Sequence, residues 1–508
     1  MNKENMNPQS SRPRHRPEFL KDFVIVIFSI LAVLIATLSP FNFSIPDSFS
    51  LSEFFGNFDN TSFLQDQINN LLLFMPFGFG CASLLQRIRI KALGKALIVI
   101  LLSAALSTTV EVLQVLLPSR TPTPADIINN TIGGFLGFIC FYSWNAQSLT
   151  DTVTRLENSK ASYSIKKITA LFLGYILLTF LLSFFWQNTI NLKNWQPNYP
   201  LLLGNEKTGN RPWQGYISEL YIADKAMSRN EVSQVFANQN YWNNIGDSLL
   251  AAYQLNGKCC NQEQAGKLPE LRWQGQPSDT QKDKGVFLNS NHWLVTATPV
   301  TSLNKRISKT SEFTISTTVA TAKTSQTGPA RIISLSGNSL QRNFTLGQQG
   351  DSLDFRLRTL MTGENGSDVK LNIPNIFVDD NPHHFVITYS KGNLFLYVDK
   401  LQNNYSLNLL ELMPKEHKLF YYGMTFIPLG FGLAILTLLA KRRLMLYRLF
   451  LTLGILLPPI MLEGILVSEN GKNLSFKTML LGVLLTAGTM VILRLRAVML
   501  LKSIVKNQ

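Results

Sequence analysis

Seven polar residues in the first quarter of the chain have types and spacings that could support chemistry. They are three pairs, each separated by three or four residues, and one arginine: Asp66 with Asn70, Glu111 with Gln114, Asp126 with Asn130, and Arg120. A spacing of three or four places both members of a pair on one helix face. Three converging carboxylates would raise one another's pKa unless the arginine or a cation compensates their charge. Such a site could hold a cation, a polar head group or a glycan-linked lipid.

Two other interpretations of these residues are open. Glu111 or Asp126 could act as a general base while Arg120 holds an anion, which would make the chain an enzyme. Alternatively, the residues serve structure alone. Asp126 is placed to cap the start of a helix, and asparagine or glutamine side chains can hydrogen-bond neighbouring helices together. Glu111 is the hardest to explain by capping because it lies inside a predicted helix.

The elements that must position these residues are apolar helices long enough to cross a bilayer. Crossing takes about 20 mostly apolar residues, and backbone groups in lipid must pair within the helix. The first apolar run has no small-residue cleavage site, so we expect a retained helix and not a signal peptide. The runs predict eight spans, at residues 23–38, 68–85, 93–117, 127–144, 168–186, 419–440, 449–467 and 479–493.

The charged residues between these runs predict their orientation. The formal net charge is +15, and the lysines and arginines collect in alternate connections between the spans. Because such residues favour the cytoplasmic side, we expect a protein of the cell membrane with both termini in the cytoplasm and residues 187–418 outside the cell. The seven polar residues then fall near the outer surface. Nucleic-acid binding is not expected, since the basic residues flank apolar runs and do not form one amphipathic face.

These boundaries divide the chain into seven predicted segments. The segments are a basic cytoplasmic tail (1–21), a four-helix bundle (22–145), a cytoplasmic loop (146–167), a fifth span (168–186), an external domain (187–418), three C-terminal spans (419–497) and a cytoplasmic tail (498–508).

Glu463 falls near the outer end of the seventh span, where it could join the polar residues or face the external segment.

The bundle resembles a known membrane family. The residues that carry the resemblance are 70–79 (NLLLFMPFGF), 111–114 (EVLQ), Arg120 and 126–134 (DIINNTIGG), in that order. Residues 20–145 are similar in these motifs to the VanZ-like family of bacterial membrane proteins. Members of that family are associated with resistance to the glycopeptide teicoplanin. The resemblance therefore implies a role in the cell envelope and supplies no reaction.

The external segment predicts an all-β domain. Alternating apolar and polar residues, separated by turn residues, are typical of antiparallel strands in a sandwich. Two adjacent cysteines, Cys259 and Cys260, lie in this segment and match no zinc or redox motif. The predicted strands are residues 215–222, 312–319, 330–335, 352–357, 384–389 and 393–398.

Parts of this segment resemble the concanavalin A-like, laminin-G type of jelly roll. Residues 381–389 (NPHHFVITY) with 394–400 (LFLYVDK) are similar to its central hairpin, although Lys400 stands where the family has glycine. Residues 247–253 resemble its opening strand, and residues 203–231 resemble its closing strand and turn. The closing piece comes first, so we expect one circularly permuted sandwich, which neighbouring termini make possible. A partial domain followed by a second one is the alternative.

The resemblance implies recognition of a carbohydrate or a protein. The paired-carboxylate strand that related glycosidases use, Glu-x-Asp-x-x-Glu, is absent. His383 and His384 are expected to be structural. The tryptophans 213, 273 and 293 could be core residues or a platform for a sugar. Asp379, Asp380 and Asn381 suggest calcium by composition only, and we expect no cofactor.

The sequence as a whole predicts a multi-pass α-helical membrane protein with an inserted concanavalin A-like sandwich. We expect an envelope protein that handles a lipid-linked or glycan component and is not an enzyme. Its expected partners are the lipid bilayer and an envelope glycan, a lipid-linked component or an external protein. Two alternatives are a membrane-embedded enzyme that acts on a lipid-linked substrate and a membrane-anchored sensor or adhesin.

Overall fold

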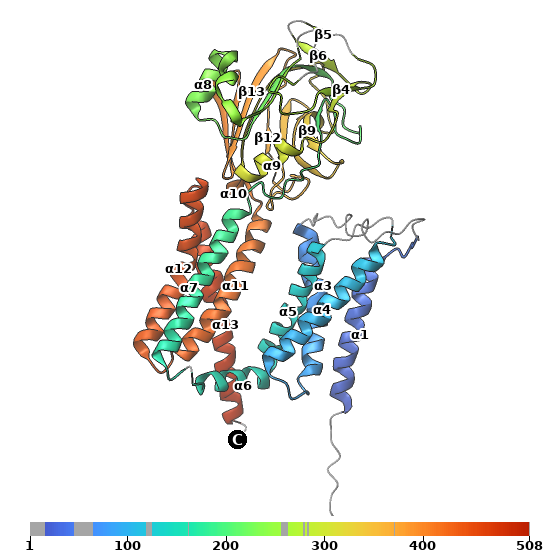
Figure 1. Cartoon of the computed structure of the whole chain (residues 1–508). Coiled ribbons are helices and arrows are strands. Elements are labelled where there is room, and N and C mark those ends of the chain that lie inside the picture. The colour runs from blue at the N-terminus through green and yellow to red at the C-terminus, as the bar shows by residue number, and fades with distance from the viewer. Residues whose placement is uncertain are drawn as a thin grey trace, which may run out of the picture. The chain divides into compact units, whose positions relative to one another are not determined.

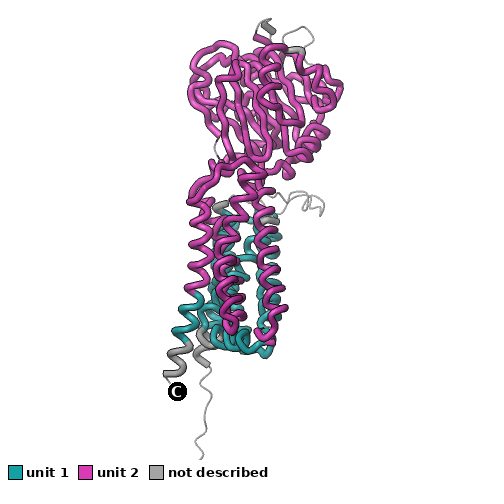
Figure 2. The backbone as a smooth tube through the Cα atoms, turned by 90° about the vertical axis from the view of Figure 1, so that its left-hand side faces the viewer, with its two compact units in different colours: residues 1–159, 493–508 teal, residues 160–492 magenta. Residues whose placement is uncertain are grey.

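The chain folds into two compact units (Figure 2). The bundle unit comprises residues 1–159 and 493–508, and the sandwich unit comprises residues 160–492. The computed structural model describes residues 16–44, 64–117, 124–160, 162–255, 263–277, 280–281, 284–369 and 371–506.

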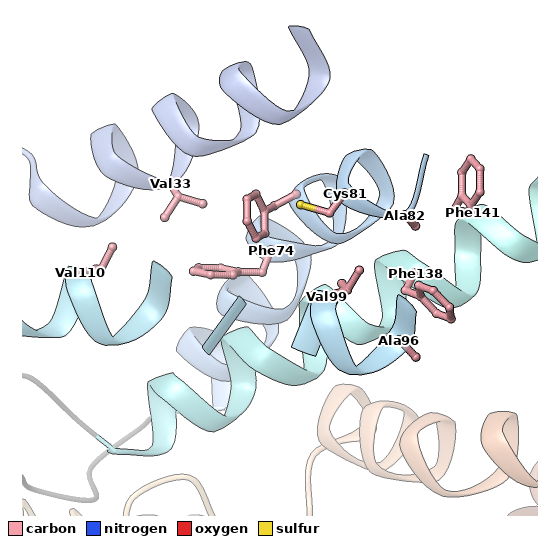
Figure 3. Close-up of a cluster of buried hydrophobic side chains, with 10 residues drawn as sticks. Val33, Phe74, Cys81, Ala82, Ala96, Val99, Val110, Phe138 and Phe141 are labelled. Carbon is pink, nitrogen blue, oxygen red and sulfur yellow. The ribbon is translucent and has the colours of Figure 1, made fainter. Parts of the chain in front are cut away.

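The bundle unit is helical. Apolar side chains from its first four described helices form one buried core, in which Phe74 lies between Val33 and Val99 (Figure 3). Phe138 and Phe141 extend this core along the fourth helix. The helices are α1 (Arg16–Leu38), α3 (Leu64–Leu85), α4 (Ala92–Gln114), α5 (Pro124–Trp144) and the shorter α6 (Ala146–Glu157).

Glycines bring α3 and α5 into backbone contact. A Cβ atom on Gly78 would overlap the carbonyl group of Gly134, and one on Gly137 would overlap the carbonyl oxygen of Met75. Gly133 and Gly137 are four residues apart on α5, the small-residue spacing that allows close approach of helices in lipid. The close packing of α3 on α5 therefore requires glycine at these positions, because any larger residue would separate the two backbones.

The sandwich unit joins a second set of apolar helices to a β-domain. The helices are α7 (Ile165–Asn188), α11 (Lys415–Leu439), α12 (Leu444–Asn470) and most of α13 (Phe476–Lys506). Phe172 on α7 stacks on Phe450 of α12, with ring centroids 4.1 Å apart. Trp186 donates a 2.9 Å hydrogen bond from its indole to Thr425 on α11. The β-domain sits at one end of α7, α11 and α12 (Figure 1).

Hydrogen bonds fix the β-domain to the helices of its own unit. The amides of Asn393 and Asn408 donate to the carbonyl oxygen of Asn470, the last residue of α12, at 2.8 and 3.0 Å. Tyr389 donates from its hydroxyl to the carbonyl oxygen of Ile190, which follows α7, at 2.5 Å. The domain is thus held at both points where the chain enters and leaves it.

The β-domain consists of two antiparallel sheets. The seven-stranded sheet has the order β12-β11-β10-β9-β1-β7-β4, and the eight-stranded sheet has the order β15-β14-β13-β8-β2-β6-β5 with β3 beside β2. Phe313, Phe344 and Phe355 bring the two sheets together. The strands are β1 (Leu201–Leu203), β2 (Gly215–Ala223), β3 (Leu249–Gln254), β4 (Leu271–Gln274), β5 (Thr280–Gln281), β6 (Gly285–Leu288), β7 (Trp293–Thr296), β8 (Glu312–Thr321), β9 (Ala330–Ser336), β10 (Arg342–Gln349), β11 (Ser352–Leu357), β12 (Leu371–Ile373), β13 (His383–Ser390), β14 (Asn393–Val398) and β15 (Lys400–Asn408).

The first two strands lie in the middle of the sheets. β1 pairs with β7 and β9, and β2 pairs with β3, β6 and β8. The segment with β1 and β2 is therefore part of the same two-sheet domain as the later strands. Among the described residues, it does not form a separate partial domain ahead of them. The helix α8 (Arg229–Ala237) and the 3-10 helix η1 (Gln239–Asn244) cover the eight-stranded sheet through Val232, Trp242 and their neighbours.

The helices agree with the predicted spans in position but differ in detail. Six described helices are long and apolar enough to cross a membrane: Asp66–Leu85, Ala92–Gln114, Ile165–Asn188, Lys415–Leu439, Leu444–Asn470 and Phe476–Leu500. The described apolar part of α1, Asp22–Leu38, is shorter than these six. The helix α5 forms where a span was predicted but is not among the six. The number of eight therefore stays a prediction. The predicted loop at residues 146–167 contains α6, and α13 runs to Lys506 where a tail was expected.

Candidate functional site

One face of α4 is both buried and polar. Ser103, Ser107, Glu111 and Gln114 follow one another at spacings of four, four and three residues, so they share a face. All four are buried, and the side chain of Glu111 is 2% exposed. Polar groups in a membrane-spanning helix are costly and mark function or helix packing.

Two neighbouring helices contribute partners to this face. Gln114 donates from its amide to the carbonyl oxygen of Thr37 on α1, at 3.1 Å. Asn130 on α5 donates to the hydroxyl of Ser107, at 2.9 Å. Within the described residues, the amide oxygen of Asn130 and the hydroxyl of Ser103 are buried without a hydrogen-bond partner. The face thus retains unused polar capacity.

The other predicted site residues lie elsewhere or outside the description. Asp66 is exposed in the first turn of α3, and Asn70 is half-buried one turn later. Asp126 is half-buried in the first turn of α5. Arg120 lies outside the described residues. The structure therefore brings Glu111, Gln114 and Asn130 to one buried face. Ser103 and Ser107 were not among the predicted site residues, although their spacing from Glu111 would have revealed them.

Glu463 belongs to the sandwich unit. Its carboxylate receives the ammonium group of Lys472 at 2.7 and 2.8 Å, the hydroxyl of Tyr422 at 3.0 Å and the hydroxyl of Thr478. Within this unit it joins α12 to the start of α13 and to α11. These partners belong neither to the seven predicted polar residues nor to the β-domain, so neither expectation for Glu463 is confirmed.

The seven-stranded sheet carries a groove on the face turned away from the eight-stranded sheet, here called the back face. Alternate rows of cross-strand partners identify it. Leu203, Ile333, Leu346 and Phe355 form a row that points to the other sheet. The adjacent row, with Leu202, therefore lies on the back face. The groove has a volume of about 300 Å³ and is lined by Leu202, Lys207, Gln274, Trp293, Val295 and Thr298 among others.

The three tryptophans have different environments. Trp213 is fully buried and donates from its indole to Gln348 at 2.9 Å, so it is a core residue. Trp293 is half-buried and lines the groove. Trp273 is half-buried with its ring against His292, 6.1 Å between centroids. Trp293 is therefore the tryptophan that a sugar could reach in this groove.

Asp399 accounts for both histidines at the start of β13. Its carboxylate accepts from the backbone N–H of His384 at 2.8 Å and lies 2.8 Å from Nδ1 of His383. This hydrogen bond raises the pKa of His383. Asp379 lies 3.4 Å from the other ring nitrogen of His383. Among the described residues, no three His, Cys, Asp or Glu side chains are placed to hold a metal ion. The expectation of no cofactor stays a prediction.

The fold and the comparison with known proteins agree on the class of this protein. Its apolar helices and two antiparallel sheets define an α-helical membrane protein with a β-sheet domain. Residues 10–145 match the VanZ/LLP1 family model, which confirms the resemblance found in the bundle. No curated protein and no solved structure matches the chain. The concanavalin A-like assignment of the sandwich therefore stays a prediction.

Proposed function

We propose that this protein resides in the bacterial cell membrane and binds an envelope glycan or glycolipid through its sandwich. The observation that carries the proposal is the groove on the back face. The half-buried ring of Trp293 lines the groove together with the hydrogen-bonding side chains of Gln274 and Lys207. An apolar wall with a few polar groups is the usual composition of a small-molecule site. A sugar ring offers the matching apolar face and hydroxyl groups.

The charge distribution supports the proposed orientation. In this orientation both termini face the cytoplasm and the sandwich lies outside. Lysines and arginines are concentrated at the ends of the spans that lie on the same side of the membrane as the two chain termini. In this arrangement the groove meets envelope components directly. The buried polar face of α4 would accommodate the polar part of a lipid-linked component within the bundle. We propose no cofactor and no nucleic-acid partner.

The proposal is tested with the full-length protein in detergent. The protein is screened against oligosaccharides and peptidoglycan fragments, with and without calcium. Binding that Trp293→Ala reduces at least tenfold, and that Phe395→Ala leaves unchanged, supports the proposal. Phe395 is the matched control because it is also partly exposed but lies on β14 of the other sheet. Cooperative thermal unfolding shows that the protein is folded. If folded protein binds none of these glycans, the proposal that the sandwich is a glycan receptor is refuted.

A membrane-embedded enzyme is the second candidate. The observation that favours it is the buried carboxyl group of Glu111, which lies one helical turn from Ser107, the residue to which Asn130 donates a hydrogen bond. Glu111→Gln would abolish turnover of a lipid-linked substrate if this carboxyl transfers a proton. The variant Asp66→Asn, at an exposed position of α3, is the control. If Glu111→Gln and wild type give the same envelope phenotype, the enzyme hypothesis is refuted. The bundle would then serve as a membrane anchor, as in a sensor or adhesin.

A further inference from the structure

Three arginines on the back face form one charged group, here called the guanidinium cluster. They are Arg331 on β9, Arg342 on β10 and Arg356 on β11. Two register shifts between β9 and β10 place Arg331 opposite Gly347 and Arg342 opposite Ser336, so both arginines lie in rows of the back face. Arg331 and Arg356 share the carboxylate of Asp354, at 3.4 and 3.0 Å. Glu206 is the second carboxylate of the group, 3.9 Å from Arg331. Arg331 and Arg356 thus pair with these two carboxylates, and Arg342 is near enough for the charges of all four groups to act on it.

The cluster is buried and its hydrogen-bonding capacity is incompletely used. Arg331 is 2% exposed and Arg342 is fully buried. Within the described residues, Nε of Arg331, Nε and Nη1 of Arg342, the hydroxyl of Thr345 and Oε2 of Glu206 have no hydrogen-bond partner. A buried donor without a partner is costly, and more so when it is charged. Four of these five atoms can donate a hydrogen bond to an anion, and the fifth, Oε2 of Glu206, can only accept one.

Burial and the charges of neighbouring arginines both act on the pKa of the two buried guanidinium groups. Burial, followed by the charges of Arg331 and Arg356, lowers the pKa of Arg342 to about 9. Burial, followed by the charge of Arg356, lowers the pKa of Arg331 to about 10. Both groups are still charged at neutral pH. An added negative charge would relieve the repulsion and pair with the unused N–H groups.

The cluster and the groove lie in one row of the sheet. Cross-strand partners run from Arg272 through Val295, Leu202, Ser334 and Thr345 to Arg356. Strands in a sheet are about 4.8 Å apart, so Thr345 lies roughly 10 Å from Leu202. Leu202 and Val295 line the groove, and Glu206 of the cluster is next in sequence to Lys207 of the groove. A ligand of more than one sugar ring spans this distance.

We propose that the back face recognises an acidic glycan, whose sugar ring lies against Trp293 and whose carboxylate or phosphate group binds the guanidinium cluster. This inference rests on the proposed glycan function and names its substrate class. Arg342 and Arg331 donate the N–H groups that are unused in the free protein. Thr345 donates its hydroxyl. The anionic group selects the ligand, and the groove holds its neutral part.

The experiment compares three probes on the full-length protein in detergent. They are a hexuronic acid trisaccharide, the neutral hexose trisaccharide of the same linkage, and inorganic phosphate alone. Isothermal titration gives each affinity at low and high salt. We expect the acidic trisaccharide to bind about tenfold or more tightly than the neutral one, and phosphate to compete with it.

Variants locate the anion on the sheet. Arg356→Gln removes the least buried guanidinium, and Thr345→Val removes the unused hydroxyl without a change of charge. Both are expected to abolish the preference for the acidic trisaccharide. Arg272→Gln is the control because Arg272 lies in the same row but is 65% exposed and outside the cluster. Thermal unfolding confirms that each variant is folded, and Thr345→Val decides the matter if the arginine variant unfolds.

Each outcome has one meaning. Equal affinity for the two trisaccharides, or equal effects of Arg272→Gln and Arg356→Gln, would overturn the acidic specificity and leave glycan binding in place. Phosphate binding that depends on Arg356, without binding of either sugar, would keep the anion site and overturn glycan recognition. Binding of none of the three probes by folded protein would overturn both proposals.

Discussion

Glu463 and Lys472 form an ion pair in which both side chains are buried, with a shortest N–O distance of 2.7 Å. The pair ties the end of α12 to the segment that leads into α13. Removing one partner of a buried pair is more damaging than removing both, because a charge then remains buried without compensation.

The first prediction follows from this pair. Glu463→Gln is expected to lower the free energy of unfolding by about 3–5 kcal/mol, as measured by chemical denaturation in detergent. Glu469→Gln is the control, since Glu469 pairs with Lys391 at 3.7 Å with both side chains half exposed or more. An exposed pair contributes about 1 kcal/mol or less. The double variant Glu463→Gln, Lys472→Met should recover much of the loss, and its failure to do so would refute the account.

The second prediction concerns the contact of α3 with α5. Gly137→Ala places a methyl group against the carbonyl of Met75 and is expected to lower the thermal unfolding midpoint of the bundle. Gly174→Ala on α7 is the control, because a Cβ there meets nothing within 4 Å. That control should be neutral or slightly stabilising, since alanine favours a helix over glycine. If both variants behave alike, the close approach of the two backbones is not needed for stability.

The third prediction separates stability from binding in the sandwich. Asp354→Asn removes a carboxylate that Arg331 and Arg356 share, and is expected to lower the free energy of unfolding by about 1–3 kcal/mol. The same change makes the guanidinium cluster more positive, so affinity for inorganic phosphate should rise. Asp351→Asn, at an exposed position just before β11, should change neither property. A fall in phosphate affinity with Asp354→Asn would contradict the proposed anion site.

The fourth prediction concerns pH. His383 faces the carboxylates of Asp379 and Asp399, and the hydrogen bond with Asp399 raises its pKa above the ordinary 6.5. Because the folded state then binds the proton more tightly, this stabilisation is complete below about pH 6.5 and is lost as the pH rises through the raised pKa. Thermal unfolding at pH values on both sides of this window should show a smaller pH effect in Asp399→Asn than in wild type.

Asparagine is the suitable replacement at position 399. Asp399 has a φ angle of 62°, and asparagine tolerates this left-handed conformation. Asp380→Asn is the matched control, because Asp380 is exposed and neighbours the site only in sequence. The same pH dependence in all three proteins would assign the titration to other groups.

The sequence predicted those parts of the fold that follow a simple pattern. Strands β2, β8, β9, β11, β13 and β14 lie where alternation indicated them. Strand β10 was missed because buried polar residues such as Arg342, Asn343 and Gln348 interrupt its apolar pattern. The edge strand β15 was missed because its alternate exposed positions are polar throughout. In both strands the sheet pairing decides the structure, and pairing partners cannot be read from a single segment.

The candidate sites were predictable to different degrees. Glu111 and Gln114 were identified because a carboxyl or an amide inside an apolar run is conspicuous. The guanidinium cluster was not, since an arginine in a strand ordinarily lies at the surface. Arg331 contacts Glu206 and Arg211 in the loop that follows β1, and Arg342 contacts Glu364 in the loop that follows β11. Burial of this kind is a property of the assembled sheet.

The position of β1 determines when the domain can be completed during synthesis. Its three leucines are fully or almost fully buried and pair on both sides, with β7 and β9. The ribosome makes Leu203 90 residues before Trp293 of β7 (293 − 203) and 127 residues before Ala330 of β9 (330 − 203). Until then this apolar segment has no strand to pair with among the described residues, and is open to chaperones or to aggregation. A nascent chain released before residue 336 would therefore be a substrate for quality control.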